Sequence, residues 1–201
     1  MKRGLLFIVT APSGAGKSTI LDRLLELFPG MEYSISVTTR PPRPGEKDGV
    51  DYHFATREEF ESKIGEEEFL EYATVYDNYY GTRKSFIEAR LDAGKDIILD
   101  IDVQGAINVK SKRSPAVYIY IIPPTMAELR RRLEGRKTDA REVIEKRLSK
   151  AAEETSFYRE YDYVVVNDDL DRAVDAMRSI VLAEKQRPSR MKEQIERFLE
   201  K

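Results

Sequence analysis

The stretch LLFIVTAPSGAGKST, residues 5–19, decides the fold expected of this chain. An apolar run, LLFIVT, precedes a glycine-rich turn, and apolar residues at helical spacing follow in ILDRLLELF, residues 20–28. This order predicts a buried strand, a tight turn and a helix. Gly14 and Gly16 allow successive N–H groups to turn toward one anion, and the helix start and Lys17 add positive charge. We therefore expect a nucleotide polyphosphate here rather than an ordinary glycine-rich turn.

The turn fits the pattern G-x-x-x-x-G-K-[ST], with Ala11 at the first glycine. In this pattern the hydroxyl of Ser18 can ligate Mg²⁺. The pattern names no reaction, because NTPases, kinases and motor proteins share it. The residues expected to contact ATP at this turn are Ser13, Gly14, Ala15, Gly16, Lys17, Ser18 and Thr19.

Composition narrows the class of protein. The 201 residues, 41% of them hydrophobic, suffice for one compact domain with a real core. A net charge of −2 provides no global attraction to nucleic acid or to an anionic membrane. The absence of cysteine excludes disulfides and thiolate chemistry and suits the cytoplasm, and a single histidine, His53, argues against a Ser-His triad. The start MKRGLLFIVTA superficially resembles a signal peptide, but its apolar run is short and continues into the glycine-rich turn, so we interpret it as a strand.

Apolar runs alternate with helical patterns along most of the chain. The runs at 97–99, 116–122 and 163–167 are typical of strands buried on both faces of a parallel sheet. Helices are expected at 18–27, 84–93, 103–111, 125–134, 139–157, 170–185 and 188–200, the fourth opened by a Thr125/Glu128 capping box. This alternation predicts an α/β fold with a mostly parallel sheet flanked by helices.

Residues 33–83 follow a different pattern. YSISVTTR, residues 33–40, alternates strictly, and FLEYATVY, residues 69–76, mixes polar and aromatic residues. Both are typical of half-exposed antiparallel strands, so we expect an inserted β lobe. One strand over 33–40 would place Ser34, Ser36, Thr38 and Arg40 on one face and Tyr33, Ile35 and Val37 on the other. The acidic stretch 58–71 is interpreted mostly as a solvated helix face.

Two basic groups could bind phosphate. Arg40 and Arg43 lie on a proline-stiffened loop with Tyr52 just beyond, a combination that suits a monophosphate but also fits solvated arginines. RRRLEGRKTDAREVIEKR, residues 130–147, contains eight basic residues, and Gly135 can end a helix there. The second group predicts a lid that brings arginines to a transferring phosphoryl group.

Carboxylates in this chain suggest which base is read. Asp100 ends an apolar strand, Asp102 follows it, and Glu71 lies in the inserted lobe. Guanine offers N1–H and an amino group as donors on one edge, whereas adenine offers an acceptor at N1, so carboxylates favour guanine. Ser36 and Thr82 could serve the remaining base or phosphate positions. Asp100 is expected to hold Mg²⁺ or its waters, as acidic residues at strand ends usually do in P-loop proteins.

The sequence resembles the guanylate kinase family over nearly its whole length. The shared segments, in family order, are APSGAGKS, SVTTRPPRPGEKDGVDYHF, FLEYATVYDNYYGT, ILDIDVQGA, RLEGR and VVVNDDLDRA. The resemblance implies a P-loop kinase with an inserted GMP-binding lobe and a helical lid, which converts ATP and GMP, and dGMP as well, to ADP and the diphosphate. The implied domains are a core of 1–32, 94–125 and 158–201, a lobe of 33–93 and a lid of 126–157.

The resemblance also implies roles for individual residues. The phosphate of GMP would be bound by Arg40, Arg43, Tyr52 and Tyr80. Guanine would be bound by Ser36, Glu71, Thr82 and Asp102, with Asp100 near the acceptor or, with Ser18, near Mg²⁺. Lys17, Arg136 and Arg147 would act on the transferring phosphoryl group, and Asn167 would lie near the adenine of ATP.

Three alternatives stay open. A guanylate-kinase-like module of scaffold proteins keeps the fold and binds peptides, but the intact Gly16-Lys17-Ser18 argues against it. A P-loop kinase that acts on another phosphorylated small molecule is less favoured than a GMP kinase, mainly because Glu71 and Asp102 suit guanine. A nucleic-acid-binding ATPase is the third alternative, but this short chain with a net charge of −2 offers no long basic track for nucleic acid. The expected partners are therefore small molecules, with neither nucleic acid nor membrane, and the sequence leaves monomer and homo-oligomer undecided.

Overall fold

The computed structural model describes residues 2–75, 77–112, 114–135 and 140–200. The chain divides into two units, the first made of Arg3–Thr10 and Gly30–Ala116 and the second of Ala11–Pro29 and Val117–Lys201. Helices and two β-sheets make up both units, so the expected α/β class is confirmed.

The main sheet is built from the apolar runs. Its order is β2-β7-β1-β8-β9, and its strands are β1 (Leu6–Thr10), β2 (Met31–Tyr33), β7 (Asp96–Asp100), β8 (Val117–Ile122) and β9 (Tyr163–Val166). The pairs β1 with β7, β2 with β7, and β8 with β9 are parallel. Every residue of β1 is buried, as expected for a strand covered on both faces.

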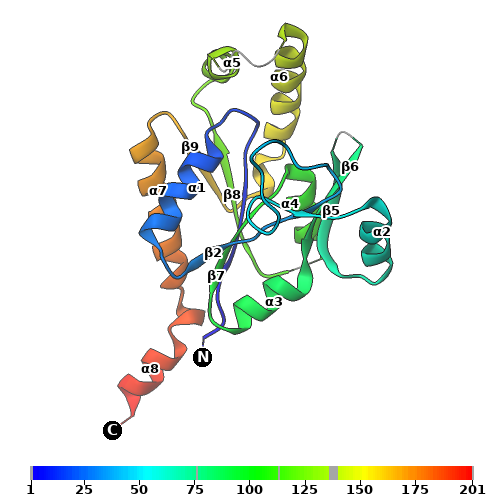
Figure 1. Ribbon diagram of the computed structural model, residues 1–201. Coiled ribbons are helices and arrows are strands. Elements are labelled where there is room, and N and C mark those ends of the chain that lie inside the picture. Colours follow the sequence, from blue (N-terminus) through cyan, green and yellow to red (C-terminus); the bar gives the residue numbers. More distant parts are fainter. Residues whose placement is uncertain (1, 76, 113, 136–139, 201) are drawn as a thin grey trace. The chain divides into compact units, whose positions relative to one another are not determined.

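The first unit also contains a smaller sheet and three helices. The sheet has the order β4-β3-β6-β5, and its strands are β3 (Val37–Thr38), β4 (His53–Phe54), β5 (Phe69–Val75) and β6 (Asn78–Arg83). The helices are α2 (Arg57–Gly65), α3 (Lys84–Asp92) and α4 (Val103–Ser111). Phe60 of α2 stacks on the Phe69 ring with 4.3 Å between centroids, and Figure 1 shows α2 beside β5 and β6. The mixed pairing, parallel for β3–β4 and antiparallel for β3–β6 and β5–β6, confirms an inserted β lobe.

The expectation of one strand over 33–40 is wrong. Tyr33 ends β2 in the main sheet, the Ser34 N–H donates to the carbonyl of Ile98, and only Val37 and Thr38 belong to the smaller sheet. Both Val37 and Thr38 are fully buried, whereas Tyr33 is 39% exposed, so the two predicted faces do not exist. An alternating sequence indicates only which way neighbouring side chains point. Whether the chain leaves one sheet and joins another depends on pairing with strands that are distant in sequence.

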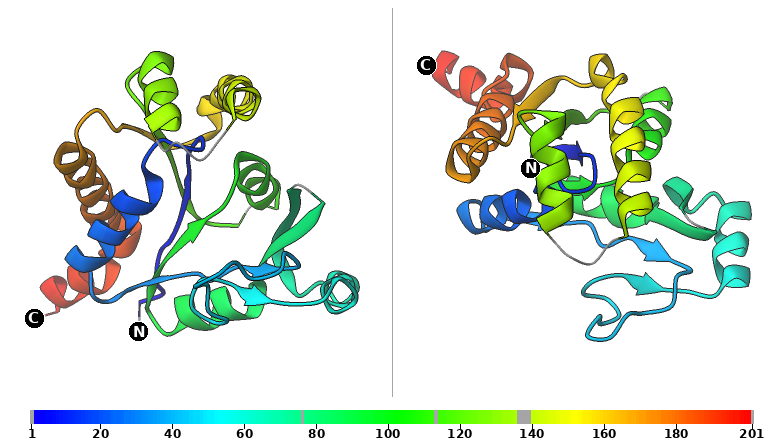
Figure 2. Two further views of the ribbon diagram at one scale, coloured as in Figure 1. Left: turned by 45° about the horizontal axis from the view of Figure 1, so that its top comes forward. Right: turned by 90° about the horizontal axis from the view of Figure 1, so that it is seen from above.

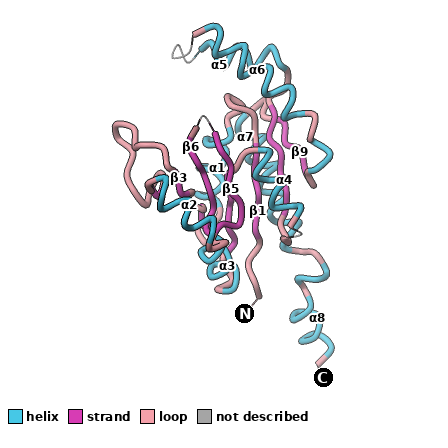
Figure 3. The backbone as a smooth tube through the Cα atoms, turned by 90° about the vertical axis from the view of Figure 1, so that its right-hand side faces the viewer, coloured by secondary structure: helices cyan, strands magenta, loops and turns pink. Residues whose placement is uncertain are grey.

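Besides β8 and β9, the second unit contains helices. They are α1 (Lys17–Leu27), α5 (Met126–Gly135), α6 (Arg141–Thr155), α7 (Leu170–Lys185) and α8 (Lys192–Leu199), with short 3₁₀ turns at Tyr158–Glu160 and Pro188–Arg190. Helix α1 runs beside α7 in both views of Figure 2. Helices α5 and α6 overlap in the view of Figure 3 and lie side by side in the right-hand view of Figure 2. They share a buried cluster that includes Leu129, Leu133 and Leu148.

Helix boundaries follow the predictions with two differences. The helix expected at 188–200 is a 3₁₀ turn followed by the shorter α8, and the acidic stretch 58–71 is divided between α2 and β5. The Thr125 hydroxyl accepts a hydrogen bond from the Glu128 N–H, as a helix cap should. Within the described residues, a search for a helix long and apolar enough to span a bilayer finds none.

Candidate functional site

The glycine-rich turn has the backbone conformation that an anion-binding loop requires. Gly14 and Gly16 have φ values of 95° and 90°, in the region that favours glycine. Lys17 opens α1, so Ser18 and Thr19 lie in its first turn, where backbone N–H groups remain available for an anion. Residues 13–19 therefore form a backbone cradle with a positive helix end beneath it.

Helices α5 and α6 contact this loop directly. A Cβ added to Gly14 would come within 2.9 Å of a Leu133 methyl and 3.1 Å of a Leu129 methyl. From α6, the Arg147 guanidinium donates to the Ser13 hydroxyl over 3.1 Å. The two predicted phosphate-site residues Ser13 and Arg147 are thus brought together, whereas Arg136 lies outside the described residues.

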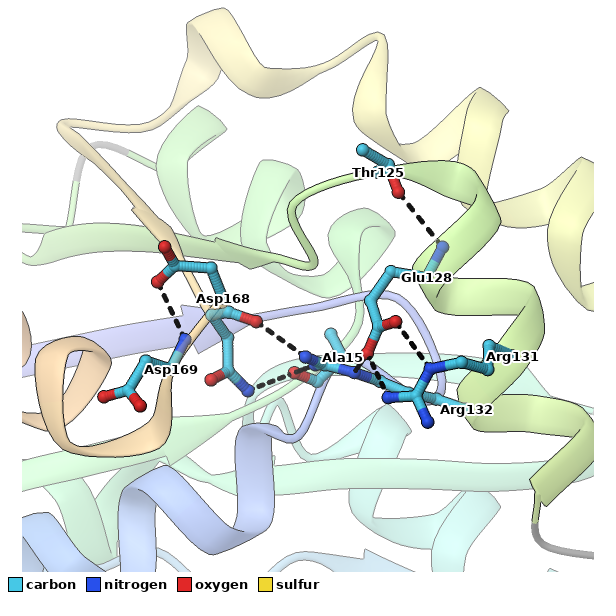
Figure 4. A network of polar contacts seen from close by, with 8 residues as sticks. Ala15, Thr125, Glu128, Arg131, Arg132, Asp168 and Asp169 are labelled. Carbon is cyan, nitrogen blue, oxygen red and sulfur yellow. Dashed lines mark hydrogen bonds and ion pairs between the residues drawn. The ribbon is translucent and has the colours of Figure 1, made fainter.

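A polar network joins α5, the loop and the end of β9 (Figure 4). The Asn167 amide donates to the Ala15 carbonyl over 2.7 Å, and Arg132 donates to the same carbonyl over 3.3 Å and to the Asn167 carbonyl over 2.9 Å. Glu128 accepts from Arg132 and from Arg131, both at 2.7 Å. These two arginines lower the pKa of Glu128 to about 2, so its carboxylate is ionised at neutral pH.

In the first unit, the two-arginine loop is organised by a residue that sequence reasoning missed. Glu46 accepts two hydrogen bonds from the Arg40 guanidinium, at 2.8 and 2.9 Å, and one from the Arg43 N–H at 2.7 Å. The Arg40 guanidinium lies 5.3 Å from the centre of the Tyr52 ring. The Tyr52 and Tyr80 rings pack edge to face, with 6.0 Å between their centroids. The four residues expected to bind the GMP phosphate are therefore drawn from one small region around β3, β4 and β6.

Two of the residues expected to read the base are in direct contact. The Thr82 hydroxyl donates to a Glu71 oxygen over 2.7 Å, and Glu71 is only 4% exposed. Burial raises the pKa of Glu71 to about 7; the neighbouring Asp102 raises it too, while the Thr82 hydrogen bond and Lys112 oppose the shift. A protonatable acceptor, shielded from water, thus faces the start of α4.

Asp102 has a structural task that the sequence did not reveal. Its carboxylate caps α4 by accepting the Gly105 N–H over 2.8 Å. Gly105 also permits the approach of Glu71, because an added Cβ would lie 2.8 Å from one Glu71 oxygen. Asp102 and Glu71 therefore meet across Gly105, at the N-terminus of one helix.

The remaining predicted residues have simple positions. Asp100 ends β7 and accepts a hydrogen bond from the Tyr33 hydroxyl over 3.2 Å. The Ser36 carbonyl accepts the His53 N–H over 2.9 Å, just before β3. Ser34, by contrast, is 2% exposed, and its hydroxyl has no hydrogen-bond partner in the described part of the chain.

Sequence reasoning overlooked the roles of Arg132, Glu128, Glu46 and Gly105. Arg132 follows Leu129 by three residues and therefore shares the side of α5 that meets Gly14, but only the structure identifies that side. Glu46 follows Arg43 by three residues in a Pro-Gly turn, a spacing that allows a carboxylate to bond back to the backbone.

Comparison with known proteins agrees with this geometry. The family model described as guanylate kinase matches residues 3–184. The guanylate kinase of Caldanaerobacter subterraneus is 50% identical over 192 residues, which cover 96% of this chain and 93% of that protein. The crystal structure of guanylate kinase from Anaplasma phagocytophilum superposes with a TM-score of 0.76 at 37% identity, covering 94% and 90% of the two chains. Shikimate kinase from Acinetobacter baumannii, at 15% identity over 92% and 97% of the chains and a TM-score of 0.50, shares the fold alone. This chain belongs to the guanylate kinase family.

Proposed function

We propose that the protein, as a guanylate kinase, transfers the γ-phosphoryl group of ATP to GMP, and to dGMP as well, and so recycles guanine nucleotides. The observation that carries the choice of guanine is the buried Glu71 carboxylate, which is oriented by Thr82 and lies beside Asp102. A buried acceptor with a half-buried one beside it suits the N1–H and amino donors of guanine and opposes the N1 acceptor of adenine. dGMP is included because none of the proposed contacts goes to the ribose 2′-hydroxyl.

The donor nucleotide is assigned to the second unit. Its triphosphate would be held by the backbone of the glycine-rich turn, by Lys17 and by the first turn of α1. The residues proposed to contact ATP are Ser13, Gly14, Ala15, Gly16, Lys17, Ser18 and Thr19. Asn167 adjoins this loop through its hydrogen bond to the Ala15 carbonyl. The contact of Arg147 with Ser13 supports a place for this guanidinium at the phosphates.

The acceptor nucleotide is assigned to the first unit. Its phosphate would be bound by Arg40, Arg43, Tyr52 and Tyr80, and its base by Ser36, Glu71, Thr82 and Asp102. In the free protein Arg40 is paired with Glu46, so an arriving phosphate would compete with that carboxylate. This pairing would orient the guanidinium before the substrate binds, and Arg40 would then exchange the Glu46 carboxylate for the phosphate.

Transfer itself needs little covalent help from the protein. The attacking group is a phosphate oxygen already ionised near neutral pH, since the second pKa of a phosphomonoester is about 6, so a general base is unnecessary. Lys17, Arg136 and Arg147 would stabilise the charge that develops on the transferring group. The remaining contribution is alignment of the two nucleotides.

Mg²⁺ fits the donor set. No cluster of three or more His, Cys, Asp or Glu side chains suited to a metal occurs among the described residues. An ion that retains waters and takes phosphate oxygens needs only a hydroxyl and a carboxylate from the protein, and Ser18 and Asp100 offer these groups. When bound, Mg²⁺ would neutralise charge on the phosphates of ATP; Asp100 would act through its waters or, alternatively, at the acceptor.

The wider assignments follow the same proposal. The functional divisions would be the core of 1–32, 94–125 and 158–201, the GMP-binding lobe of 33–93 and the lid of 126–157. The substrates are small molecules, and the cytoplasm is the compartment that supplies both nucleotides. The proposed sites bind nucleotides, and neither nucleic acid nor a membrane surface is proposed as a partner.

One experiment tests this function. ADP formation is measured with ATP and Mg²⁺ while GMP, dGMP, AMP, CMP and UMP are offered separately. Rapid turnover is expected with GMP and dGMP, and little with the other three nucleotides. Preference for another acceptor would favour a different P-loop kinase, and absence of turnover with every nucleotide would favour a peptide-binding module.

A further inference from the structure

The Ala15 carbonyl receives two side-chain donors in the middle of the phosphate loop. The Asn167 amide lies 2.7 Å from this oxygen and an Arg132 nitrogen lies 3.3 Å from it, while Ala15 itself is fully buried. Asn167 is also 6% exposed. The Asn167 amide nitrogen is thus engaged with the backbone of the loop, and this contact points to a role at the phosphates.

The loop is shaped to allow this approach. A Cβ added to Gly16 would lie 2.4 Å from the Asn167 amide nitrogen, so glycine is required there by contact as well as by its φ of 90°. Arg132 is itself held in place, because its Nε donates to Glu128 over 2.7 Å and another nitrogen donates to the Asn167 carbonyl over 2.9 Å. Asn167 and Arg132, with Glu128 behind Arg132, thus fix the direction of one carbonyl (Figure 4).

Fixing that carbonyl also fixes the next N–H. In a planar trans peptide the C=O and N–H bonds point in opposite directions, so the Gly16 N–H must point away from Asn167 and Arg132. A glycine on the C-terminal side of a peptide makes rotation of that peptide easy, because positive and negative φ values are both accessible. Without the two donors, the Gly16 N–H could turn away from an anion held by the loop.

We propose that Asn167 and Arg132 are positioning residues that hold the Ala15–Gly16 peptide with its N–H directed at the phosphates of the donor nucleotide. The inference rests on the proposed ATP site and deepens it: Asn167 serves phosphate binding through the loop rather than reading adenine. Glu128 supports the arrangement by orienting Arg132.

The neighbouring Arg131 provides a matched control. It donates to the same Glu128 over 2.7 Å, yet its side chain is 74% exposed and these hydrogen bonds go to Glu128 rather than to the loop. Arg131→Ala removes an equal charge from the same helix and a partner of the same carboxylate. Any effect of Arg132→Ala beyond that of Arg131→Ala therefore reports the contact with Ala15 and Asn167.

The test uses inorganic tripolyphosphate, which has the phosphates of ATP and no base. Its dissociation constant and that of ATP are measured by calorimetry for the wild-type chain and for Asn167→Ala, Arg132→Ala, Arg132→Lys and Arg131→Ala. We expect Asn167→Ala and Arg132→Ala to weaken both ligands by the same factor, roughly tenfold for a lost hydrogen bond in a charged network. The dissociation constants of Arg132→Lys should lie between those of the two alanine variants and those of the wild type. The dissociation constants of Arg131→Ala should stay within about twofold of the wild-type values.

Two further measurements separate the possible outcomes. The ratio of kcat/KM for ATP and GTP as donors should be unchanged in Asn167→Ala, and the KM for GMP should be unaffected. Weakened ATP binding with unchanged tripolyphosphate binding would overturn the proposal and assign Asn167 to adenine. If Asn167→Ala fails to fold, as judged by its unfolding temperature, the proposal is decided by comparing the tripolyphosphate and ATP dissociation constants of Arg132→Ala with those of Arg131→Ala. A wild-type chain that binds tripolyphosphate without phosphorylating GMP would refute the proposed function and leave the loop test intact.

Discussion

At the scale of single residues, the environment of Glu71 opposes its charge. The carboxylate is 4% exposed, accepts a hydrogen bond from Thr82 of β6, and has Asp102 and Gly105 of α4 as neighbours. Lys112, beyond the end of α4, is the cation that partly compensates. Because burial has the largest effect, the pKa of Glu71 is raised from 4.5 to about 7. Such a group is half protonated in the free protein at the pH where it is proposed to accept hydrogen bonds.

Binding of GMP should therefore release a proton from Glu71. Guanine donors require the ionised carboxylate, so the affinity for GMP should fall as the pH drops from 8 to 6 and the free protein becomes protonated. Calorimetry of GMP binding at pH 7 in buffers of different ionisation enthalpy measures the proton release directly. The same titrations with Glu71→Gln subtract the contribution of the GMP phosphate. Equal proton release by both proteins would contradict this prediction.

The same shift predicts a pH-dependent cost in stability. A carboxyl group whose folded pKa exceeds its unfolded pKa stabilises the fold below the unfolded value, and this contribution is lost as the pH rises through the folded value. The relevant window runs from 4.5 to about 7. Above it, ionised Glu71 should cost on the order of 3 kcal/mol, from about 1.4 kcal/mol per pKa unit.

Glu71→Gln should therefore be more stable than the wild type at pH 8, and this advantage should shrink at pH 5. Urea unfolding at the two pH values measures the difference in free energy of unfolding. The variant should at the same time lose roughly ten- to a hundredfold in kcat/KM for GMP, while AMP is hardly affected. A variant that is destabilised equally at both pH values would show that Glu71 is a packing residue rather than a strained binding group.

At the scale of elements, the two-arginine loop of residues 39–52 belongs to the acceptor side. Arg43→Met should lower the affinity for GMP by roughly tenfold or more and leave the affinity for ATP within about twofold of the wild-type value. The reason is that the change removes a guanidinium proposed to bind the GMP phosphate, and this guanidinium belongs to the first unit. Separate titrations of the two nucleotides measure this. Equal losses for both nucleotides would mean that the loop has been assigned to the wrong substrate.

The predictability of each element depends on what fixes it. The strands β1, β7 and β8 could be predicted because burial on both faces leaves continuous apolar runs, and α4 and α7 because spacing and polar ends define them. The two-residue strands β3 and β4 have no such signal. Strand β3 pairs with β4 and with β6, so that Val37 lies opposite His53 and Gly81, which are distant in sequence. Local alternation over 33–40 therefore gave a wrong prediction.

The site divides in the same way. The conformation of the glycine-rich turn could be predicted because its motif is particular. Glu71 and Thr82 were selected by their hydrogen-bonding chemistry and are in contact, while their role at the base stays a prediction. Arg132 could not be singled out among neighbouring arginines without knowing which side of α5 meets Gly14. The Glu46 contact with Arg40 depends on how one turn closes, a property of backbone geometry that residue type alone does not determine.

At the scale of the whole molecule, the proposed donor and acceptor contacts come from different units of the chain. The loop, α1, Arg147 and Asn167 belong to the second unit, and Arg40, Arg43 and Glu71 belong to the first. Binding energies of residues that share no partners are usually additive. A change on the donor side should therefore leave the affinity for GMP alone intact, although it abolishes the reaction that needs both nucleotides.

Lys17→Ala is the sharpest case. Lys17 is the first residue of α1 and is proposed to meet the β- and γ-phosphates, so its removal should lower kcat at least about a hundredfold through lost charged hydrogen bonds. GMP binding, measured by calorimetry without ATP, should stay within about twofold, and the urea midpoint should match the wild type because a lysine-to-alanine change favours helix. Near-normal turnover would refute residues 11–18 as the ATP site. Loss of GMP binding at an unchanged urea midpoint would instead show that Lys17 serves the acceptor as well, and the separation of donor and acceptor contacts between the two units would then be wrong.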